Sequence, residues 1–221
     1  MKATACCLCL FCLFSAATVP VFAQSCWEKI ASPTSASFAD VRFLSASTGI
    51  AVGGDGDTGT NGIIMRTTDG GLNWTNVLSV PTTSFLSVFF LPDIQTGWAV
   101  GHKGMVAKTT NGGMSWTTSV LPNNPQLTGV YFTSTNNGFI VGEGDRIYRT
   151  TNGGNNWNLQ QGSSSALLAV NFPSASVGYI AGSGGRMLKT TNGGNSWAPI
   201  TSPGSVFDAV TDLFFLNDNT G

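Results

Sequence analysis

Charged side chains are scarce in this sequence, which has 10 Lys and Arg and 11 Asp and Glu among its 221 residues. In ordinary soluble proteins about a quarter of the residues are charged. A nucleic-acid-binding surface needs clustered Lys and Arg, and a disordered segment combines high net charge with few apolar residues. The net charge of -1 and the hydrophobic share of 42% argue against both classes. We therefore expect no nucleic-acid partner.

Histidine and cysteine are also too few for the sites they usually build. The one histidine, His102, excludes a His-rich metal site. Four of the five cysteines lie within the first 12 residues, and only Cys26 lies beyond the apolar N-terminal run. A mature chain with one cysteine has no disulfide framework. We predict no metal and no cofactor.

The N-terminus has the pattern of a secretory signal peptide. Lys2 precedes an apolar run that reaches Ala17, and Val21-Phe22-Ala23 supplies small residues for cleavage after Ala23. We predict that residues 1–23 are removed and that 24–221 are secreted. The run is too short to cross a membrane, and nothing later approaches ~18 continuous apolar residues. A lipid anchor on Cys26 is the alternative, although the residues before it match the required Leu-led box poorly.

The sequence is rich in glycine, with 28 of 221 residues, and it contains a repeat. An eight-residue box motif occurs four times, and its Asp or Asn position recurs in steps of 42, 41 and 40 residues. The copies are TTDGGLNW (67–74), TTNGGMSW (109–116), TTNGGNNW (150–157) and TTNGGNSW (190–197). Near-constant spacing of this kind indicates a repeat architecture.

Two further signatures precede each box motif. One is bounded by glycines: GIAVG (49–53), GWAVG (97–101), GFIVG (138–142) and GYIAG (178–182). The other alternates: DVRFLS (40–45), SVFFLP (87–92), GVYFTS (129–134), AVNFPS (169–174) and DLFFLN (212–217). Each period of ~40 residues thus holds four short strand signals and no helical periodicity, which is the size of one propeller blade. The sequence predicts an all-β protein, a β-propeller of four-stranded antiparallel blades at about 38–80, 85–121, 127–161 and 167–200.

The two ends of the mature chain do not coincide with the boundaries of whole blades. Residues 27–31 have the position of an outer strand that closes the ring, and 207–221 have the position of the start of a fifth blade. From this phase we expect the 24–221 propeller to be truncated and the sequence to be a fragment.

The box motif resembles the Asp-box (BNR) repeat of sialidases, sortilin-type receptors and xyloglucan-degrading hydrolases. The fuller unit, with its Gly-aromatic-x-x-Gly signature and a Lys or Arg before each Thr-Thr, resembles the photosystem II stability/assembly-factor-like family. The resemblance covers residues 27–221. It implies a propeller whose box turns lie on the outer rim, and it implies that basic residues can contact a partner protein or pigment.

We predict that the box residues are structural. Paired glycines permit the positive φ of a tight turn, an Asp or Asn side chain can bond backbone N–H groups across it, and a Trp supplies a large apolar surface. These residues are Asp69, Asn111, Asn152, Asn192, Trp74, Trp116, Trp157 and Trp197. The basic residue before each box, at 66, 108, 149 and 189, is interpreted as a solvated structural position.

Loops between the second and third strands are the expected binding positions, because loops carry most variation in a propeller. The candidate contact residues are His102, Glu143, Asp145, Arg146 and Arg186. The first such loop, 53–62, is the longest and contains Asp55 and Asp57. We interpret it as a polar insertion rather than a Ca²⁺ loop, because no acid follows at the twelfth position.

No catalytic residues can be assigned. Glycoside hydrolysis needs two carboxylates facing across a sugar, and the nine Asp and two Glu form no recognisable pair. We therefore predict a non-enzymatic binding or scaffold module for a protein or glycan ligand. The alternative is a glycoside hydrolase, of the sialidase or xyloglucanase type, with some catalytic residues in blades beyond Gly221.

Overall fold

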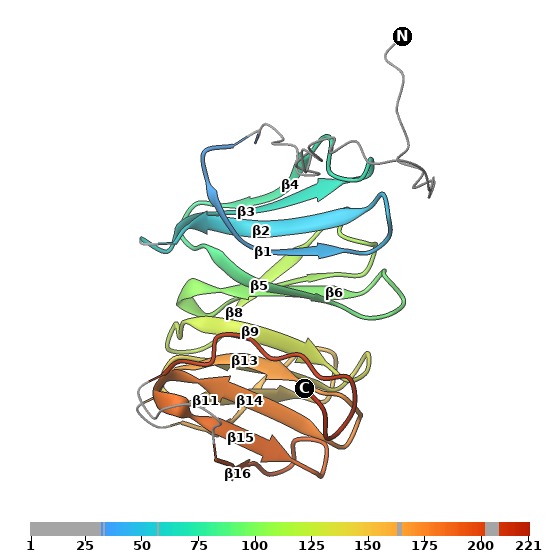
Figure 1. Cartoon of the computed structure of the whole chain (residues 1–221). Coiled ribbons are helices and arrows are strands. Elements are labelled where there is room, and N and C mark those ends of the chain that lie inside the picture. The colour runs from blue at the N-terminus through green and yellow to red at the C-terminus, as the bar shows by residue number, and fades with distance from the viewer. Residues whose placement is uncertain (1–31, 33, 57, 163–164, 202–207) are drawn as a thin grey trace, which may run out of the picture. The chain divides into compact units, whose positions relative to one another are not determined.

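The computed structural model describes residues 32, 34–56, 58–162, 165–201 and 208–221. The predicted signal peptide and the predicted outer strand at 27–31 lie outside these residues. The described chain folds into four four-stranded antiparallel sheets, each formed by four strands in sequence order (Figure 1). The prediction of an all-β propeller fold is confirmed.

Each sheet is one blade, numbered here from the N-terminus. Blade 1 contains β1 (Ser37–Phe43), β2 (Gly49–Asp55), β3 (Thr60–Thr67) and β4 (Thr75–Val80). Blade 2 contains β5 (Phe85–Phe90), β6 (Gly97–Gly101), β7 (Met105–Thr109) and β8 (Thr117–Val120). Blade 3 contains β9 (Leu127–Phe132), β10 (Gly138–Gly142), β11 (Arg146–Thr150) and β12 (Asn158–Gln161). Blade 4 contains β13 (Leu167–Asn171), β14 (Gly178–Gly182), β15 (Met187–Thr190) and β16 (Ala198–Pro199). Short 3-10 turns, His102–Gly104 and Ser183–Gly185, follow β6 and β14.

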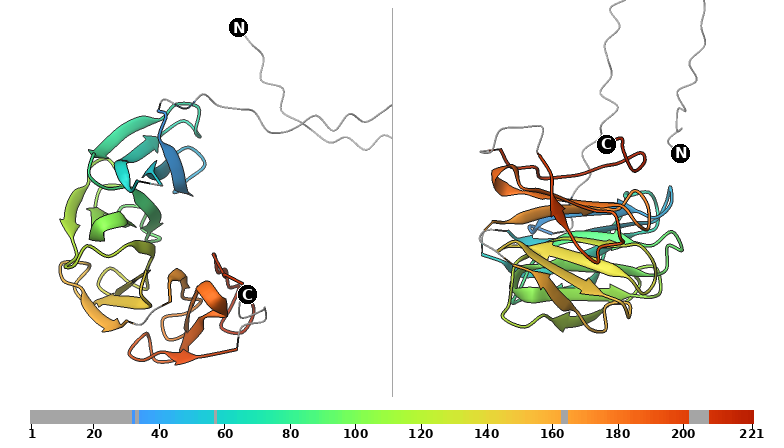
Figure 2. Two further views of the ribbon diagram at one scale, coloured as in Figure 1. Left: turned by 90° about the vertical axis from the view of Figure 1, so that its left-hand side faces the viewer. Right: turned by 90° about the horizontal axis from the view of Figure 1, so that it is seen from below.

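The hydrophobic core lies between the blades. Consecutive blades pack against each other in chain order, and β1, β5, β9 and β13 are the inner strands (Figure 2). One cluster joins Ile50 and Val52 of blade 1 to Phe85 and Phe90 of blade 2. Equivalent clusters join blades 2 and 3 and blades 3 and 4. Each sheet is therefore apolar on both faces, which explains why the second-strand signature has no polar residue.

An aromatic stack forms the centre of each later interface. Trp98 of β6 stacks on Phe132 of β9, with ring centroids 3.4 Å apart and an interplanar angle of 8°. Phe139 of β10 stacks on Phe172 in the same way, at 4.7 Å and 21°. In blades 2 to 4 the second glycine of the box turn packs against the second-strand side chain of the preceding blade. A Cβ at Gly154, for example, would lie 3.0 Å from the Trp98 indole nitrogen. The glycine-aromatic signature thus creates a flat surface for the next blade.

The basic residue before each of the first three boxes forms the second half of the interface with the following blade. The Nε of Arg66 donates to the carbonyl of Gly112 at 3.0 Å, and the Nζ of Lys108 donates to that of Gly153 at 2.7 Å. Arg149 donates to the Asn195 side chain of blade 4. These half-buried cations hold the box turn of the following blade. These contacts agree with the interpretation of the positions as structural, but the side chains are half-buried rather than fully solvated, because oxygens of the neighbouring blade replace part of the water.

The box turns show how the motif stabilises the chain reversal between the third and fourth strands. The Thr67 hydroxyl donates to Asp69 Oδ1 at 2.8 Å, and the same oxygen accepts the N–H of Asn73 at 2.9 Å. Asn152 makes the equivalent bonds with Thr150 and Asn156 at 2.9 and 3.0 Å. The box tryptophans are half-buried and pack edge-on against the inner-strand Phe of their own blade, as Trp157 does on Phe132.

Asp69→Asn should lower the free energy of unfolding slightly at neutral pH, because the Asn73 side-chain N–H loses the Asp69 Oδ2 acceptor. Asn152→Ala should lower it by about 1 kcal/mol. In the three boxes with Asn, the amide oxygen accepts the same hydroxyl and backbone N–H bonds that Asp69 Oδ1 accepts. Alanine at this position cannot accept either bond. Hydrogen bonds lower the pKa of Asp69 from 3.8 to about 2, so its charged form contributes stability above 3.8 that is lost as the pH falls toward 2. Urea unfolding at several pH values should show that the stability of Asp69→Asn falls less steeply below pH 4 than that of the parent chain. An equal fall in both proteins would contradict this account.

The expectation that 207–221 begin a fifth blade stays a prediction. Residues 208–221 contain only an isolated bridge between Asn217 and Thr220 and no regular strand. Phe215 nevertheless stacks on Tyr179 of β14, at 4.0 Å and 10°, and the Tyr179 hydroxyl donates to the carbonyl of Asp218 at 2.7 Å. An inner strand forms its backbone hydrogen bonds with the second strand of its own blade. The described residues contain no second strand that could pair with 212–216, so this segment is not a regular strand.

Candidate functional site

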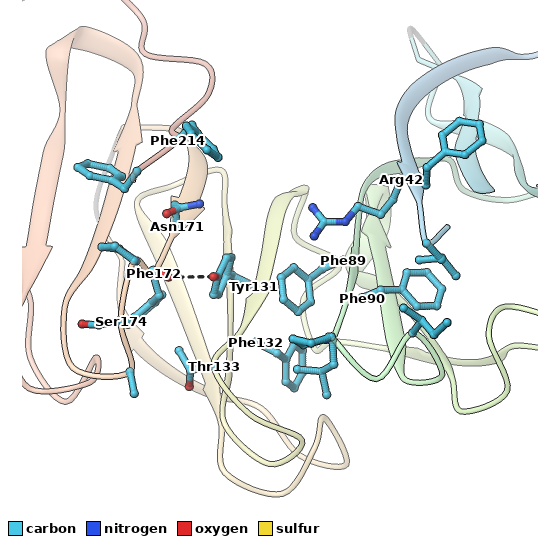
Figure 3. A pocket seen from close by; sticks show the side chains of 18 residues that line it. Arg42, Phe89, Phe90, Tyr131, Phe132, Thr133, Asn171, Phe172, Ser174 and Phe214 are labelled. Atoms are coloured by element: carbon cyan, nitrogen blue, oxygen red, sulfur yellow. Dashed lines mark hydrogen bonds between the residues drawn. The ribbon is translucent and has the colours of Figure 1, made fainter. Parts of the chain in front are cut away.

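The principal cavity lies between the inner strands of all four blades. Its volume is about 710 Å³, and its walls come from the ends of β1, β5, β9 and β13, the turns that follow them, and Phe214 and Phe215. The inner-strand signature places its third residue here in each blade: Arg42, Phe89, Tyr131 and Asn171 (Figure 3). The residues flanking that position are Val and Phe, and in blades 2 to 4 they are buried between blades, so packing does not determine the third position.

A continuous row of contacts runs along one wall of this cavity. The Arg42 guanidinium carbon lies 5.9 Å from the centroid of the Phe89 ring. Phe89 contacts Tyr131 with centroids 4.7 Å apart, and Tyr131 continues to Phe172 at 5.7 Å. The Tyr131 hydroxyl donates to the Phe172 carbonyl at 2.8 Å, which fixes the ring in place (Figure 3).

The electrostatics of this wall favour an anionic ligand. Arg42 is exposed, and within the described residues its guanidinium forms no ion pair, although its charge lowers the pKa of the Asp40 carboxyl, which burial raises. Burial raises the pKa of Tyr131 above its ordinary value, so the phenol stays neutral and keeps donating its hydrogen bond. A cation beside aromatic faces suits a group that carries both a negative charge and an apolar surface.

A smaller cavity of about 290 Å³ lies at the other end of the inner strands, and it is lined in part by Asp40, Ser87, Thr128 and Asp212. The Asp40 Oδ2 accepts the backbone N–H of Val88 in blade 2 at 2.8 Å, and Oδ1 accepts that of Val41 at 2.8 Å. Burial raises the pKa of Asp40, and these backbone bonds oppose the rise. The carboxylate thus connects two blades.

The five loop residues predicted as contacts lie at this second end, where the loops join second and third strands. Asp145 is buried and pairs with Arg186 of blade 4, with the Arg186 Nη2 2.9 Å from the Asp145 Oδ2. Arg146 donates to the carbonyl of Glu143 in its own loop at 3.3 Å. His102 is half-buried, and burial lowers its pKa, helped by the charge of Lys103.

The structure therefore gives the Asp145–Arg186 pair a place in the interface between blades 3 and 4. Whether the loop face binds a ligand stays a prediction. In the long loop, Asp55 accepts a bond from Asn61 at 2.8 Å, and Asp57 lies outside the described residues. Within the described ranges, no three His, Cys, Asp or Glu side chains are grouped to hold a metal.

Sequence reasoning missed the aromatic cavity because its residues were read as part of a strand pattern. Arg42, Phe89, Tyr131 and Asn171 occupy one position that changes chemically from blade to blade, while its neighbours remain Val and Phe. That contrast was the available signal. Where one position varies among the blades and its neighbours do not, packing does not determine the side chain at that position.

The family model described as photosynthesis system II assembly factor YCF48 matches residues 19–129 and 115–205. The chain belongs to this family. Among solved structures, YCF48 from Cyanidioschyzon merolae matches at 23% identity with a TM-score of 0.62, covering 87% of this chain and 64% of that one. This YCF48-family chain thus spans somewhat less than two thirds of that relative. A structure of YCF48 bound to D1 peptide matches at 20% identity with a TM-score of 0.52, covering 78% and 83% of the two chains.

Glycoside hydrolases also share the fold. The GH74 enzyme of Niastella koreensis matches at 20% identity with a TM-score of 0.57, covering 74% of this YCF48-family chain and 30% of the enzyme. These likenesses establish the propeller architecture alone. No curated protein matches the sequence. In the described part of the chain, no helix has the length and apolar character needed to cross a membrane.

Proposed function

We propose that this chain is a non-enzymatic propeller that binds a protein partner in the aromatic cavity. The observation that carries the proposal is the Arg42 guanidinium, which lies beside the wall of Phe89 and Tyr131 and forms no ion pair in the described residues. The preferred ligand is an extended peptide segment with an acidic group next to an aromatic or apolar side chain. Membership of the YCF48 family, and the D1 peptide bound by one YCF48, support a peptide over other ligands.

Binding is favoured over glycoside hydrolysis by the chemistry of the cavity lining. Hydrolysis needs an acid and a base or nucleophile placed on either side of the scissile bond. The walls of the larger cavity carry Arg, Asn, Thr, Ser and apolar side chains, and neither Asp nor Glu. The Asp40 carboxylate at the opposite end already accepts two backbone N–H groups. A glycan that stacks on Phe89 and Tyr131 is the second candidate, because a GH74 glycoside hydrolase shares the propeller fold.

Arg42→Gln should weaken binding of short acidic, aromatic peptides by about ten- to hundredfold, since a charge-assisted hydrogen bond contributes about 1.5–3 kcal/mol. Fluorescence anisotropy with labelled synthetic peptides measures the change. Arg146→Gln is the matched control, because Arg146 lies in the loops at the other end of the blades and should leave affinity unchanged.

The same titration with xyloglucan oligosaccharides and sialosides tests the glycan alternative. If a sugar binds, if Phe89→Ala abolishes that binding, and if no peptide binds, the glycan alternative would replace the peptide proposal. Peptide binding that depends on Arg146 and not on Arg42 would move the site to the loop face predicted from sequence. Hydrolysis of either sugar would return the chain to the enzyme class.

We also propose that the protein is exported with removal of residues 1–23. The support is the sequence pattern of Lys2, the apolar run and the small residues before Gln24. N-terminal sequencing of protein recovered from outside the cytoplasm should begin at Gln24. A mature start at a lipidated Cys26, or an intact N-terminus in the cytoplasm, would contradict this proposal.

A further inference from the structure

The turn that follows β5 is one residue longer than the equivalent turns of the other blades. Between the inner-strand Phe and the next glycine signature, blade 2 has the six residues 91–96, whereas the other blades have the five residues 44–48, 133–137 and 173–177. The N–H of Ile94 donates to the carbonyl of Leu91 at 2.9 Å, which closes a tight turn. The extra residue is accommodated at Ile94, whose φ is 54°.

Isoleucine is a poor choice for this backbone conformation. A left-handed residue brings its Cβ close to a carbonyl oxygen, and a branched Cβ makes the crowding worse. Glycine normally takes the left-handed position that follows a turn of this kind. The other non-glycine residues with positive φ in the described ranges are chiefly Asn and Asp: Asn61, Lys103, Asn123, Asn124 and Asp145.

The strain at this position is confined to blade 2. The carbonyl oxygen of Ile94 lies 3.4 Å from where a Cβ of Gly112, the first glycine of the box turn, would be. The residues that approach the first box glycine in the same way in the other three blades are Ala46, Thr135 and Ala175, and none of these three has a positive φ. Asparagine or glycine at 94 would relieve the strain, so packing of the turn does not explain the isoleucine.

The surroundings of Ile94 hold its backbone in place and leave its side chain at a cavity wall. The Asp93 Oδ1 accepts the backbone N–H groups of Gln95 and Thr96, both at 2.9 Å, and the Gln95 carbonyl accepts the N–H of Gly112 at 2.9 Å. The Ile94 side chain is 41% exposed and lines the aromatic cavity, and the hydrophobic core clusters of the described residues do not include it. Strained residues that their surroundings fix in this way gather at ligand sites.

We infer that Ile94 determines the specificity of the aromatic cavity by contacting the apolar or aromatic side chain of the bound peptide. The inference rests on the proposed function and adds a second contact to it. Arg42 meets the acidic group of the ligand, while Phe89 and Ile94 come from one blade, on β5 and in the turn that follows it. A ligand side chain that covers Ile94 removes apolar surface from water, which favours peptides with a large apolar residue.

Ile94→Asn should raise the melting temperature of the free protein by about 2–4 °C, because asparagine tolerates the left-handed conformation. The same variant should bind a short peptide with an acidic residue next to Phe about five- to tenfold more weakly, since the apolar contact is lost. Its affinity for the same peptide with Ala in place of Phe should change by less than about twofold. Thermal unfolding and fluorescence anisotropy measure the two effects.

Two further variants serve as controls. Ile94→Val keeps a branched apolar side chain, so it should melt like the parent chain and bind the Phe peptide within about twofold of it. Val120→Asn replaces a similarly exposed branched side chain, at 55%, on the outer strand β8 of the same blade. It should leave the affinity unchanged and should not raise the melting temperature.

The outcomes separate this inference from the proposed function. A parent chain that binds neither peptide would overturn the proposed function and this inference with it. Binding of the Phe peptide that depends on Arg42 and not on Ile94 would overturn this inference alone. An Ile94→Asn variant that melts at or below the temperature of the parent chain would do the same, and so would an equal loss of affinity for both peptides.

Discussion

Gly101→Ala should lower the free energy of unfolding by about 3 kcal/mol or more, and the variant is expected to be largely unfolded at 37 °C. A Cβ at Gly101 would lie 1.9 Å from the Ser84 carbonyl oxygen and 2.7 Å from the Phe85 Cα. Both atoms belong to the backbone of the adjacent inner strand, so no rotamer change can relieve the contact. The backbone of Gly101 itself is extended, with φ of -170°. The loss of stability therefore comes from a steric clash that pushes the second strand away from the inner strand.

Gly56→Ala is the matched control for this prediction, because a Cβ there meets no atom within 4 Å. Its stability should stay within about 0.5 kcal/mol of the parent chain. Urea denaturation followed by tryptophan fluorescence compares the two variants. Equal stability of Gly101→Ala and the parent would show that the second strand can move away from the inner strand, and the rigid-sheet account would fail.

Arg186→Ala should destabilise the protein by about 2–3 kcal/mol, since it removes the partner of a buried carboxylate. The Asp145 side chain is 2% exposed and the Arg186 side chain 31% exposed, so solvent screens part of the loss. Arg146→Ala should cost less than about 0.5 kcal/mol, because its guanidinium bonds to its own loop. Thermal and urea unfolding of both variants provide the comparison.

A double variant separates charge burial from lost packing. Asp145→Asn combined with Arg186→Met removes both charges and keeps the side-chain volumes, so it should recover most of the stability lost in Arg186→Ala. If Arg186→Ala instead leaves unfolding unchanged and abolishes ligand binding, Arg186 is a contact residue of the loop face. The interpretation of the pair as a link between blades would then be wrong.

Much of the fold could be read from the sequence because the repeat encodes it locally. The box motif at 67–74 and its three copies fix where each third strand turns into a fourth, since paired glycines accept the positive φ that other residues avoid. The Gly-x-x-x-Gly signature fixes the second strand, whose terminal glycines lie where the inner strand approaches too closely for a Cβ. Local signals repeated four times reinforce one another, so strand order followed without knowledge of any distant contact.

Contacts between blades could not be read in the same way. Lys108 looks like an exposed cation in its own strand, and only the neighbouring blade places the Gly153 carbonyl 2.7 Å from its Nζ. Asp145 looks like a loop acid available to a ligand, and only blade 4 buries it against Arg186. The partners in both pairs are more than 40 residues apart in sequence, so no local pattern marks them.

The sequence by itself thus determined the blades, their strands and their turns, since these depend on backbone conformation within about 40 residues. Tertiary structure alone decided which side chains meet between blades, where the cavity opens, and which residues face it. Arg42, Phe89 and Tyr131 are separated by whole blades in the chain, and they form one wall because consecutive sheets bring their inner strands together. The site is a product of stacking repeats, and its chemistry appears only when equivalent positions of different blades come into contact.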